Sequence, residues 1–293
     1  MRIVFIGSVK FSFRVLERLV GLNAEIVGVC TLQESKFNAD HIDLSSFSET
    51  HGIPSLYADD INATETLTWI KEKSPDVIFC FGWSRLIKQD LLELAPLGVV
   101  GFHPSALPAN RGRHPIIWTL VLGLKKTAST FFFMDAGVDT GDILSQQEIS
   151  ITDQDDALTL YDKVIETALS QITKFLPQLA TGSFQRIKQK EQYANMWRKR
   201  GIPDGKIDWR MSTQSIYNLV RGLTTPYIGA HFLVDGKEIK VWKSAIVTDV
   251  PNNIEPGKVL RQSNAGTVVK CGIGAICLTV TEPLFEPNIG SYL

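Results

Sequence analysis

His103 is the residue of this chain best placed for proton-transfer chemistry. It follows an apolar, strand-like run over residues 97–100 and lies in a segment, residues 101–115, that is held by three prolines and two glycines. Open α/β sheets build their sites at the carboxyl ends of strands, and a stiff loop limits how far an imidazole can move. A lone histidine is usually structural, but this loop also holds further polar residues: Ser105, Arg111, Arg113 and His114.

A second loop, over residues 134–144, is rich in Asp and Gly and lies between two strand-like runs. One interpretation is a turn capped by Asp side chains. The other is that it supplies a carboxylate that orients the imidazole of His103 or receives a proton. Neither loop offers a set of metal ligands, and the chain has no P-loop and no nucleophile elbow. We therefore expect no metal.

Composition indicates an ordinary globular protein. The chain has 293 residues, 44% of them hydrophobic and 21% charged, with a net charge of −1, which suits one large or two modest domains. No apolar run is long enough to span a membrane, and the apolar stretch over residues 1–7 is too short for a signal peptide. The four cysteines form no CxxC pair, so we expect reduced thiols and a cytoplasmic location. The near-neutral charge argues against bulk nucleic-acid binding.

Strand-like and helical patterns alternate over the first two thirds of the chain, which predicts an α/β fold with a doubly wound, mostly parallel sheet. Predicted strands cover residues 2–7, 24–30, 76–81, 98–103, 129–134 and 143–149, and predicted helices cover 13–21, 40–51, 61–73, 89–94, 116–124 and 155–179. After Gly201 a helix over 212–222 and five short β-like runs indicate a small β-rich domain. We expect a catalytic domain over 1–184, a linker over 185–204 and the small domain over 205–293.

The turn after the first predicted strand reads Gly7-Ser8-Val9-Lys10. It is not GxGxxG, so it does not support dinucleotide binding. Its backbone N–H groups can approach an anionic ligand, or the segment is only a tight turn that caps a helix. Both interpretations stay open.

The two loops together resemble those of the 10-formyltetrahydrofolate-dependent formyltransferases. The matching segments are HPSALPANRGRHP at 103–115 and MDAGVDTGDIL at 134–144, with further likeness at residues 1–8, 204–209, 221–223 and 229–230. The resemblance covers nearly the whole chain. It implies a Rossmann-like catalytic domain followed by an OB-like C-terminal domain, and 10-formyltetrahydrofolate as co-substrate.

The resemblance also implies roles for individual residues. Protonated His103 would stabilise the oxyanion, and Asp139 would accept the proton of the attacking amine. The folate would lie against residues 82–87 and the backbone of 135–140, although Trp83 is equally well explained as a core residue. We assign catalytic roles to His103, Asp139 and Ser105. We assign folate binding to Gly82, Trp83, Ser84, Arg85, Leu86, Ile87, Asp135, Ala136, Gly137 and Val138. Substrate binding is assigned to Gly7, Ser8, Lys10, Arg111, Arg113, Tyr193, Trp197, Arg198 and Lys199.

The chain departs from the family pattern at one position. The family carries Asn two residues before its histidine, where this chain has Gly101, so one hydrogen-bond donor to the formyl oxygen is missing. By analogy with other oxyanion donors its loss would cost ~3 kcal/mol. Another group replaces it, or His103 acts alone, or the protein is an inactive relative. We favour replacement because His103, Ser105, Arg111 and Asp139 are present.

The acceptor is a nucleotide-linked amino sugar or a tRNA. Residues 205–293 carry nine Lys and Arg against seven Asp and Glu, a weak basis for RNA binding. The loop over 33–40 is short. It lacks the Gly- and Lys-rich insertion that resembles a tRNA-contacting loop in methionyl-tRNA formyltransferases. Basic residues gather instead over 186–200 beside Tyr193 and Trp197, which suits a diphosphate and a stacked base; the alternative is a solvated linker.

We therefore predict an N-formyltransferase that acts on a UDP- or dTDP-linked amino-deoxy sugar for surface glycan synthesis. Methionyl-tRNA formyltransferase is the alternative enzyme, and a catalytically impaired folate- or nucleotide-sugar-binding homologue is the alternative without activity. We expect no tRNA partner and no membrane partner, and leave a homodimer open.

Overall fold

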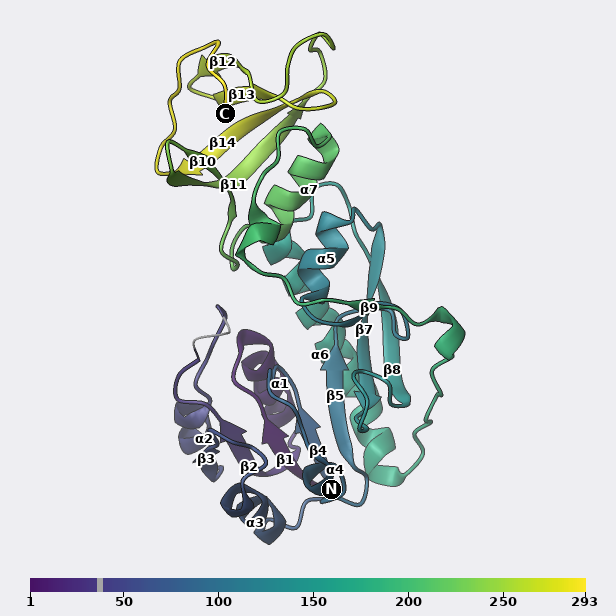
Figure 1. The fold of residues 1–293 in the computed structure, drawn as a ribbon. Coiled ribbons are helices and arrows are strands. Elements are labelled where there is room, and N and C mark those ends of the chain that lie inside the picture. Colours follow the sequence, from purple (N-terminus) through teal and green to yellow (C-terminus); the bar gives the residue numbers. More distant parts are fainter. Residues whose placement is uncertain (36–38) are drawn as a thin grey trace. The chain divides into compact units, whose positions relative to one another are not determined.

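The computed structural model describes residues 1–35 and 39–293, which form two compact units (Figure 1). The first comprises Met1–Gly112, Thr127–Ile149 and Asp162–Trp197, and the second comprises Arg113–Lys126, Ser150–Tyr161 and Arg198–Leu293. These units cut across the expected boundaries at 184 and 205, because two stretches of the expected catalytic domain pack with the C-terminal part. The loop over 33–40 was compared above with a tRNA-contacting loop. Its residues 36–38 lie outside the described residues.

The first unit is built on a seven-stranded sheet of order β3-β2-β1-β4-β5-β7-β8. The strands are β1 (Arg2–Ile6), β2 (Glu25–Thr31), β3 (Ser55–Tyr57), β4 (Val77–Cys80), β5 (Val99–His103), β7 (Lys126–Phe133) and β8 (Ile143–Ser150). Pairing is parallel from β3 to β5, and β7 runs antiparallel to β5. The prediction of a mostly parallel, doubly wound sheet is confirmed.

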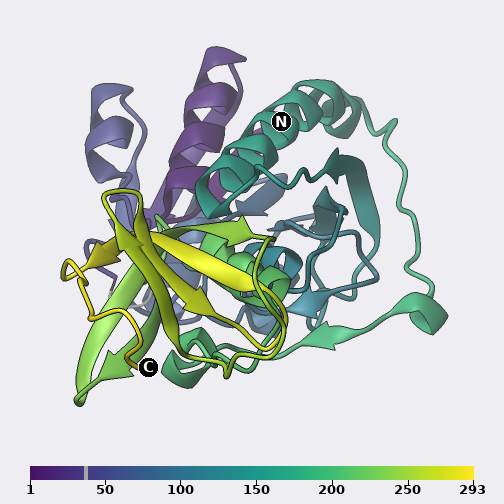
Figure 2. The same cartoon turned by 90° about the horizontal axis from the view of Figure 1, so that it is seen from above.

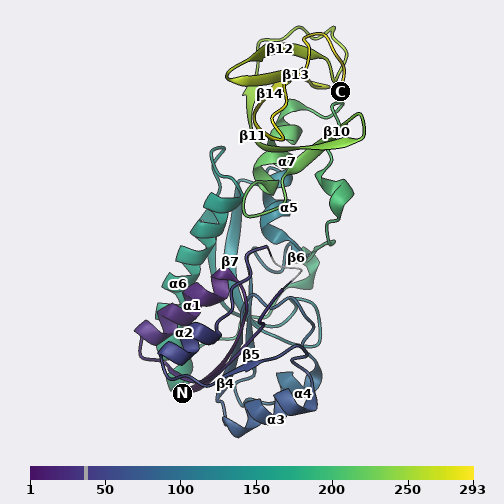
Figure 3. The same ribbon diagram turned by 90° about the vertical axis from the view of Figure 1, so that its left-hand side faces the viewer.

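Helices cover both faces of this sheet, which explains why β1 and β4 are almost wholly apolar. Helices α1 (Lys10–Gly21), α2 (Ser45–Thr50) and α6 (Ala157–Thr181) lie on one side, and α3 (Thr64–Glu72) and α4 (Gln89–Leu92) lie on the other (Figure 3). Ion pairs join α1 to α6, with Lys10 2.8 Å from Asp162 and Arg14 3.2 Å from Glu166. On the α1 face, Phe5, Phe79, Phe81, Phe131 and Phe175 make ring contacts.

Two elements of the first unit differ from the sequence prediction. The helix expected over 40–51 begins only at Ser45, because His41 instead forms a β-bridge with Val9 and its Nδ1 hydrogen-bonds to the carbonyl of Ser8 at 2.9 Å. Strand β3 was not predicted; it has three residues at the edge of the sheet and no buried side chain, so it leaves no hydrophobic pattern in the sequence.

The second unit combines helices with a five-stranded sheet of order β10-β11-β14-β13-β12, as expected for a small β-rich domain. Its elements are α5 (Pro115–Val121), η2 (Ile202–Gly205), α7 (Thr213–Leu223), β10 (Ala230–Val234), β11 (Lys237–Val247), β12 (Val259–Ser263), β13 (Gly266–Lys270) and β14 (Ala275–Glu282). Pairing is antiparallel throughout. Helix α7 lies against this sheet (Figure 2). Its residues Ile216, Leu219 and Val220 join a core with Phe232 and Val241.

The described helices include none that is both long and apolar enough to cross a membrane.

Candidate active site

His103 ends β5 with its side chain only 7% exposed. Its Nε2 lies 2.8 Å from the backbone carbonyl of Asn110, and its Nδ1 lies 3.6 Å from Oδ2 of Asp139. A carbonyl can only accept, so Nε2 carries a proton. The geometry therefore places the imidazole of His103 beside the carboxylate of Asp139.

The carboxylate of Asp139 is held by its surroundings. Oδ2 accepts a 2.9 Å hydrogen bond from the N–H of Gly112. The residue takes the left-handed φ of 55°, which is uncommon for a residue other than glycine and is often found at functional sites. Gln189 donates from Nε2 to the carbonyls of both Asp139 and Gly141 at 2.8 Å. These contacts fix the loop that carries the candidate proton acceptor.

Arg111, predicted to bind substrate, is turned toward the protein. It is 5% exposed, and its guanidinium donates to Glu191 at 2.7 and 2.9 Å and to Gln189 at 2.8 and 3.2 Å. Its hydrogen bond to Glu191 raises the pKa of Arg111 and lowers the pKa of Glu191. Arg111 thus ties the segment containing Gln189 and Glu191 to the catalytic loop. Arg111 is itself the first residue of the short strand β6 (Arg111–Gly112), which pairs in parallel with β9 (Met196–Trp197).

Gln189 and Glu191 were missed by sequence reasoning. Their only signal was membership of the charged segment 186–200, which points to a ligand as readily as to an internal contact.

Ser105 shapes the loop around the histidine. The residue is fully buried, its hydroxyl donates to the carbonyl of Ala109 at 3.0 Å, and its own carbonyl accepts from the hydroxyl of Thr130 at 2.6 Å. The structure therefore places its hydroxyl in a hydrogen bond that holds the turn between His103 and Asn110.

The segment after β4 has features that fit a flat, polar heterocycle. Gly82 has φ 67°, and a Cβ there would lie 2.2 Å from Cγ2 of Val9. The Nε1–H of Trp83 is buried with no hydrogen-bond partner among the described residues, and such an orphan costs about 1–3 kcal/mol. Leu86 is 71% exposed. A ligand such as a folate has a hydrogen-bond acceptor that could pair with the Nε1–H of Trp83. It also has an apolar face that could cover the side chain of Leu86.

The remaining predicted folate contacts lie in the loop of Asp139. Oδ1 of Asp135 accepts hydrogen bonds from the N–H of Gly137 at 3.0 Å and from the hydroxyl of Thr140 at 2.5 Å. This Asx turn leaves Ala136 exposed and Val138 50% exposed. Around the other segment, Ser84 is half-buried, Arg85 is exposed and lies 6.0 Å from the ring of Trp83, and Ile87 is buried.

The first βα turn is tightly packed. A Cβ at Gly7 would lie 2.5 Å from Cβ of Ser12, and Ser8 is 1% exposed with an unpartnered hydroxyl. Lys10, predicted to bind substrate, pairs with Asp162 as described above. The turn therefore serves the packing of α1, and a ligand role for these residues remains a prediction.

The basic segment predicted to bind a nucleotide is divided between the units. Tyr193, 62% exposed in η1 (Glu191–Tyr193), and half-buried Trp197 belong to the first unit. Arg113, Arg198 and Lys199 belong to the second unit. There Arg198 pairs with Asp204 at 2.5 Å.

Within the second unit, the guanidinium groups of Arg198 and Arg200 lie 5.2 and 4.6 Å from the ring of Trp118. His114 accepts a hydrogen bond at Nδ1 from the N–H of Arg200. Burial and the charge of Arg200 lower the pKa of His114.

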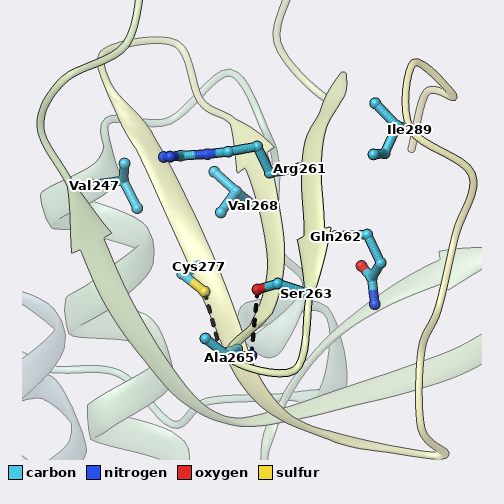
Figure 4. Close-up of a pocket in the computed structure, with 8 residues that line it drawn as sticks. All are labelled: Val247, Arg261, Gln262, Ser263, Ala265, Val268, Cys277 and Ile289. Atoms are coloured by element: carbon cyan, nitrogen blue, oxygen red, sulfur yellow. Dashed lines mark hydrogen bonds between the residues drawn. The ribbon is translucent and has the colours of Figure 1, made fainter.

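A hollow of about 470 Å³ lies in the second unit between β11, β12, β13, β14 and the C-terminal segment (Figure 4). None of the predicted site residues lines it; its lining includes Arg261, Val268 and Cys277. Among the described residues there is no group of three or more His, Cys, Asp or Glu side chains placed to hold a metal ion.

Comparison with known proteins identifies the class. The formyl transferase family model matches residues 1–176, and the model of the formyl transferase C-terminal domain matches residues 203–284. The chain belongs to this family and is a formyl-transferring enzyme. The methionyl-tRNA formyltransferase of Geobacter metallireducens is 34% identical over 283 residues, which cover 94% of this chain and 89% of that protein.

Two solved structures share the fold. The N-formyltransferase from Helicobacter canadensis, in complex with folinic acid and dTDP-3-aminofucose, is 16% identical with a TM-score of 0.71 over 94% of this chain and 98% of that one. WlaRD, a sugar 3N-formyltransferase crystallised with dTDP and 5-N-formyl-THF, is 19% identical with a TM-score of 0.71 over 95% of this chain and 97% of that one.

Proposed function

We propose that this enzyme transfers the formyl group of 10-formyltetrahydrofolate to the amine of a UDP- or dTDP-linked amino-deoxy sugar, for surface glycan synthesis. The observation that carries the reaction is the pair formed by His103 and Asp139, whose carboxylate is fixed by the N–H of Gly112. The four cysteines of the enzyme are all free thiols, which supports a reducing, cytoplasmic location.

In this reaction a bond forms between the amine nitrogen and the formyl carbon, and the bond from that carbon to the folate nitrogen breaks. Asp139 accepts the proton that the amine loses, and one proton must reach the leaving folate nitrogen, so that tetrahydrofolate is released and the proton count balances. His103, whose Nδ1 lies 3.6 Å from Oδ2 of Asp139, helps to hold this carboxylate in place until the proton arrives. Bound folate supplies the activated formyl carbon.

Trp83 supports the position of the folate. Its free Nε1–H would gain an acceptor, so binding would remove the cost of an unsatisfied buried donor. The exposed apolar side chains of Leu86 and Val138 flank the two loops that would hold the ring. Folates are present in both solved structures named above.

The charge balance of the C-terminal part supports a small acceptor, since residues 205–293 carry only nine Lys and Arg against seven Asp and Glu. In the second unit Arg198 pairs with Asp204, Arg210 pairs with Asp208 at 2.5 Å, and Lys258 lies 3.9 Å from Glu255. RNA binding needs several cations free to replace counterions along the phosphate backbone. A nucleoside diphosphate needs only a few cations and one stacking ring. Tyr193 is the exposed ring of the first unit that we assign to this role.

Methionyl-tRNA formyltransferase is the second candidate function. It is favoured by the 34% identity to a protein of that name over most of both chains. A gel-shift assay with initiator tRNA separates the two, because a tRNA enzyme must show salt-sensitive binding and a sugar enzyme shows none.

The decisive experiment is turnover with a panel of acceptors. Purified enzyme is mixed with 10-formyltetrahydrofolate and either UDP- and dTDP-amino sugars or charged initiator tRNA, and tetrahydrofolate release and N-formyl product are measured. We expect release with at least one amino sugar and none with tRNA. Formylation of Met-tRNA without any sugar product would replace this proposal by the second candidate. His103→Ala serves as the inactive control.

A further inference from the structure

Asn110 has a backbone that is fixed on both sides and contacts His103 through its carbonyl. Its carbonyl accepts from Nε2 of His103 at 2.8 Å, and its N–H donates to Oδ1 of Asn195 at 2.7 Å. It takes the left-handed φ of 67°, which Asn tolerates better than most residues. Among the described residues its half-buried carboxamide has no hydrogen-bond partner.

Formyl transfer needs a donor at the formyl oxygen, where negative charge develops as the amine attacks. Four other donors of the loop are committed to protein acceptors. These are Nε2 of His103 to Asn110, the N–H of Gly112 to Asp139, the hydroxyl of Ser105 to Ala109, and the guanidinium of Arg111 to Glu191. The second ring nitrogen of His103 faces Asp139. Among the described residues, the carboxamide of Asn110 is a donor of this loop that has no protein acceptor.

Strand β5 supplies no substitute. Gly101 has no side chain, and its place is filled: a Cβ there would lie 2.8 Å from Cγ of Met134 and 3.1 Å from Cζ of Phe132. A larger residue at 101 would require Met134 to move. The strand has therefore closed around glycine, and a donor must come from the loop.

We propose that the Nδ2–H of Asn110 donates the hydrogen bond that stabilises the formyl oxygen during transfer. This inference rests on the formyl transfer of the proposed function and not on the identity of the acceptor. Asn110 exchanges no proton; its hydrogen bond strengthens while charge grows on the oxygen and weakens when the bond to the folate nitrogen breaks. His103 is a positioning residue for Asn110, because its Nε2 donates a hydrogen bond to the backbone carbonyl of Asn110.

The test compares Asn110→Gly with Asn110→Asp. Glycine keeps the left-handed backbone and the carbonyl that His103 requires and removes only the carboxamide. Aspartate keeps the shape but replaces the donor by an acceptor. We expect kcat to fall about 10²–10³-fold in both variants, with KM values for folate and acceptor changed less than about threefold, since the lost interaction belongs to the transition state. The unfolding midpoint of Asn110→Gly should not fall, which separates the effect from misfolding.

An infrared measurement tests the same contact without an acceptor. The probe is 10-formyl-5,8-dideazafolate labelled with ¹³C in the formyl group, bound to wild type or to Asn110→Gly. A hydrogen bond to the formyl oxygen lowers its stretching frequency in wild type, and we expect the frequency to rise in the variant. An unchanged frequency, or a kcat of Asn110→Gly within about threefold of wild type, would overturn the inference. If no amino sugar is formylated the proposed acceptor fails, while the infrared comparison still decides the role of Asn110.

Discussion

The carboxylate of Asp139 lies 3.6 Å from Nδ1 of His103, although 36 residues separate the two in the chain. The strands that precede the two loops, β5 and β7, are antiparallel neighbours with Val100 opposite Phe133, so the second loop begins at the end of β5 opposite to His103 and must run back to reach it. Asp139 is also held by the N–H of Gly112, so the carboxylate bridges both loops. Its position suits a proton acceptor whose direction is set by the protein before substrate binds.

Asp139→Asn is expected to lower kcat by about 10²–10⁴-fold, because the amide keeps the shape of the carboxylate but cannot accept the proton. Substrate KM should change little. The measurement is steady-state release of tetrahydrofolate, with exposed Asp90→Asn in α4 as a matched control that should retain wild-type turnover. More than a tenth of wild-type activity in Asp139→Asn would remove this residue from the mechanism.

Gly141→Ala is expected to destabilise the first unit by about 3 kcal/mol and to abolish activity. A Cβ at Gly141 would lie 1.7 Å from the carbonyl oxygen of Phe133, so the loop that carries Asp139 must shift. Gly21→Ala is the control, because a Cβ there meets nothing within 4 Å and alanine favours the helix. Urea unfolding should separate the two variants, and equal midpoints would show that the loop accommodates the methyl group.

Stability of the second unit should fall in mild acid because of His114. Burial and the charges of Arg200 and Arg113 lower the pKa of its imidazole from 6.5. As the pH falls below 6.5, the unfolded chain binds the proton while folded His114 stays neutral, so folding loses free energy until the pH passes the lower folded pKa.

His114→Asn removes this titration while keeping an oxygen acceptor and a residue that tolerates its φ of 55°. The drop in unfolding midpoint between about pH 7.5 and about pH 5.5 should therefore be smaller in the variant than in wild type. Identical drops would show that His114 does not carry the effect.

Thiol reactivity should be confined to one residue. Burial raises the pKa of Cys30 and of Cys80 to about 12, and Cys271 is fully buried, so none of the three offers an accessible thiolate near pH 8. Cys277 is partly exposed, and burial raises its pKa, so it should react slowly. An aromatic disulfide reagent should titrate one thiol in wild type and none in Cys277→Ser until urea is added. Two fast thiols in the native protein would contradict this burial.

Much of the fold was readable in the sequence because hydrophobic patterns are local. The buried runs of β1, β4 and β5 and the amphipathic α7 are visible as residue spacing, and so is the change to short strands after Gly201. The exposed edge strand β3 was not readable in the sequence, because its three residues bury no side chain. His103 and Asp139 were found from their residue types and their loops. Their proximity was not readable, because β7 runs antiparallel to β5 and the loops after the two strands begin at opposite ends of the pair.

The sequence by itself determined the sheet, the two loops and the chemistry of their histidine and aspartate. Only the tertiary structure decided which polar groups are free to meet a ligand. Arg111 and Lys10 looked available, yet each pairs with a carboxylate distant in the chain, Glu191 and Asp162. Asn110 gave no signal, yet its carboxamide has no hydrogen-bond partner within residues 1–35 and 39–293. The reason is physical: pairing depends on contacts between residues far apart in the chain, and residue type and spacing carry no record of them.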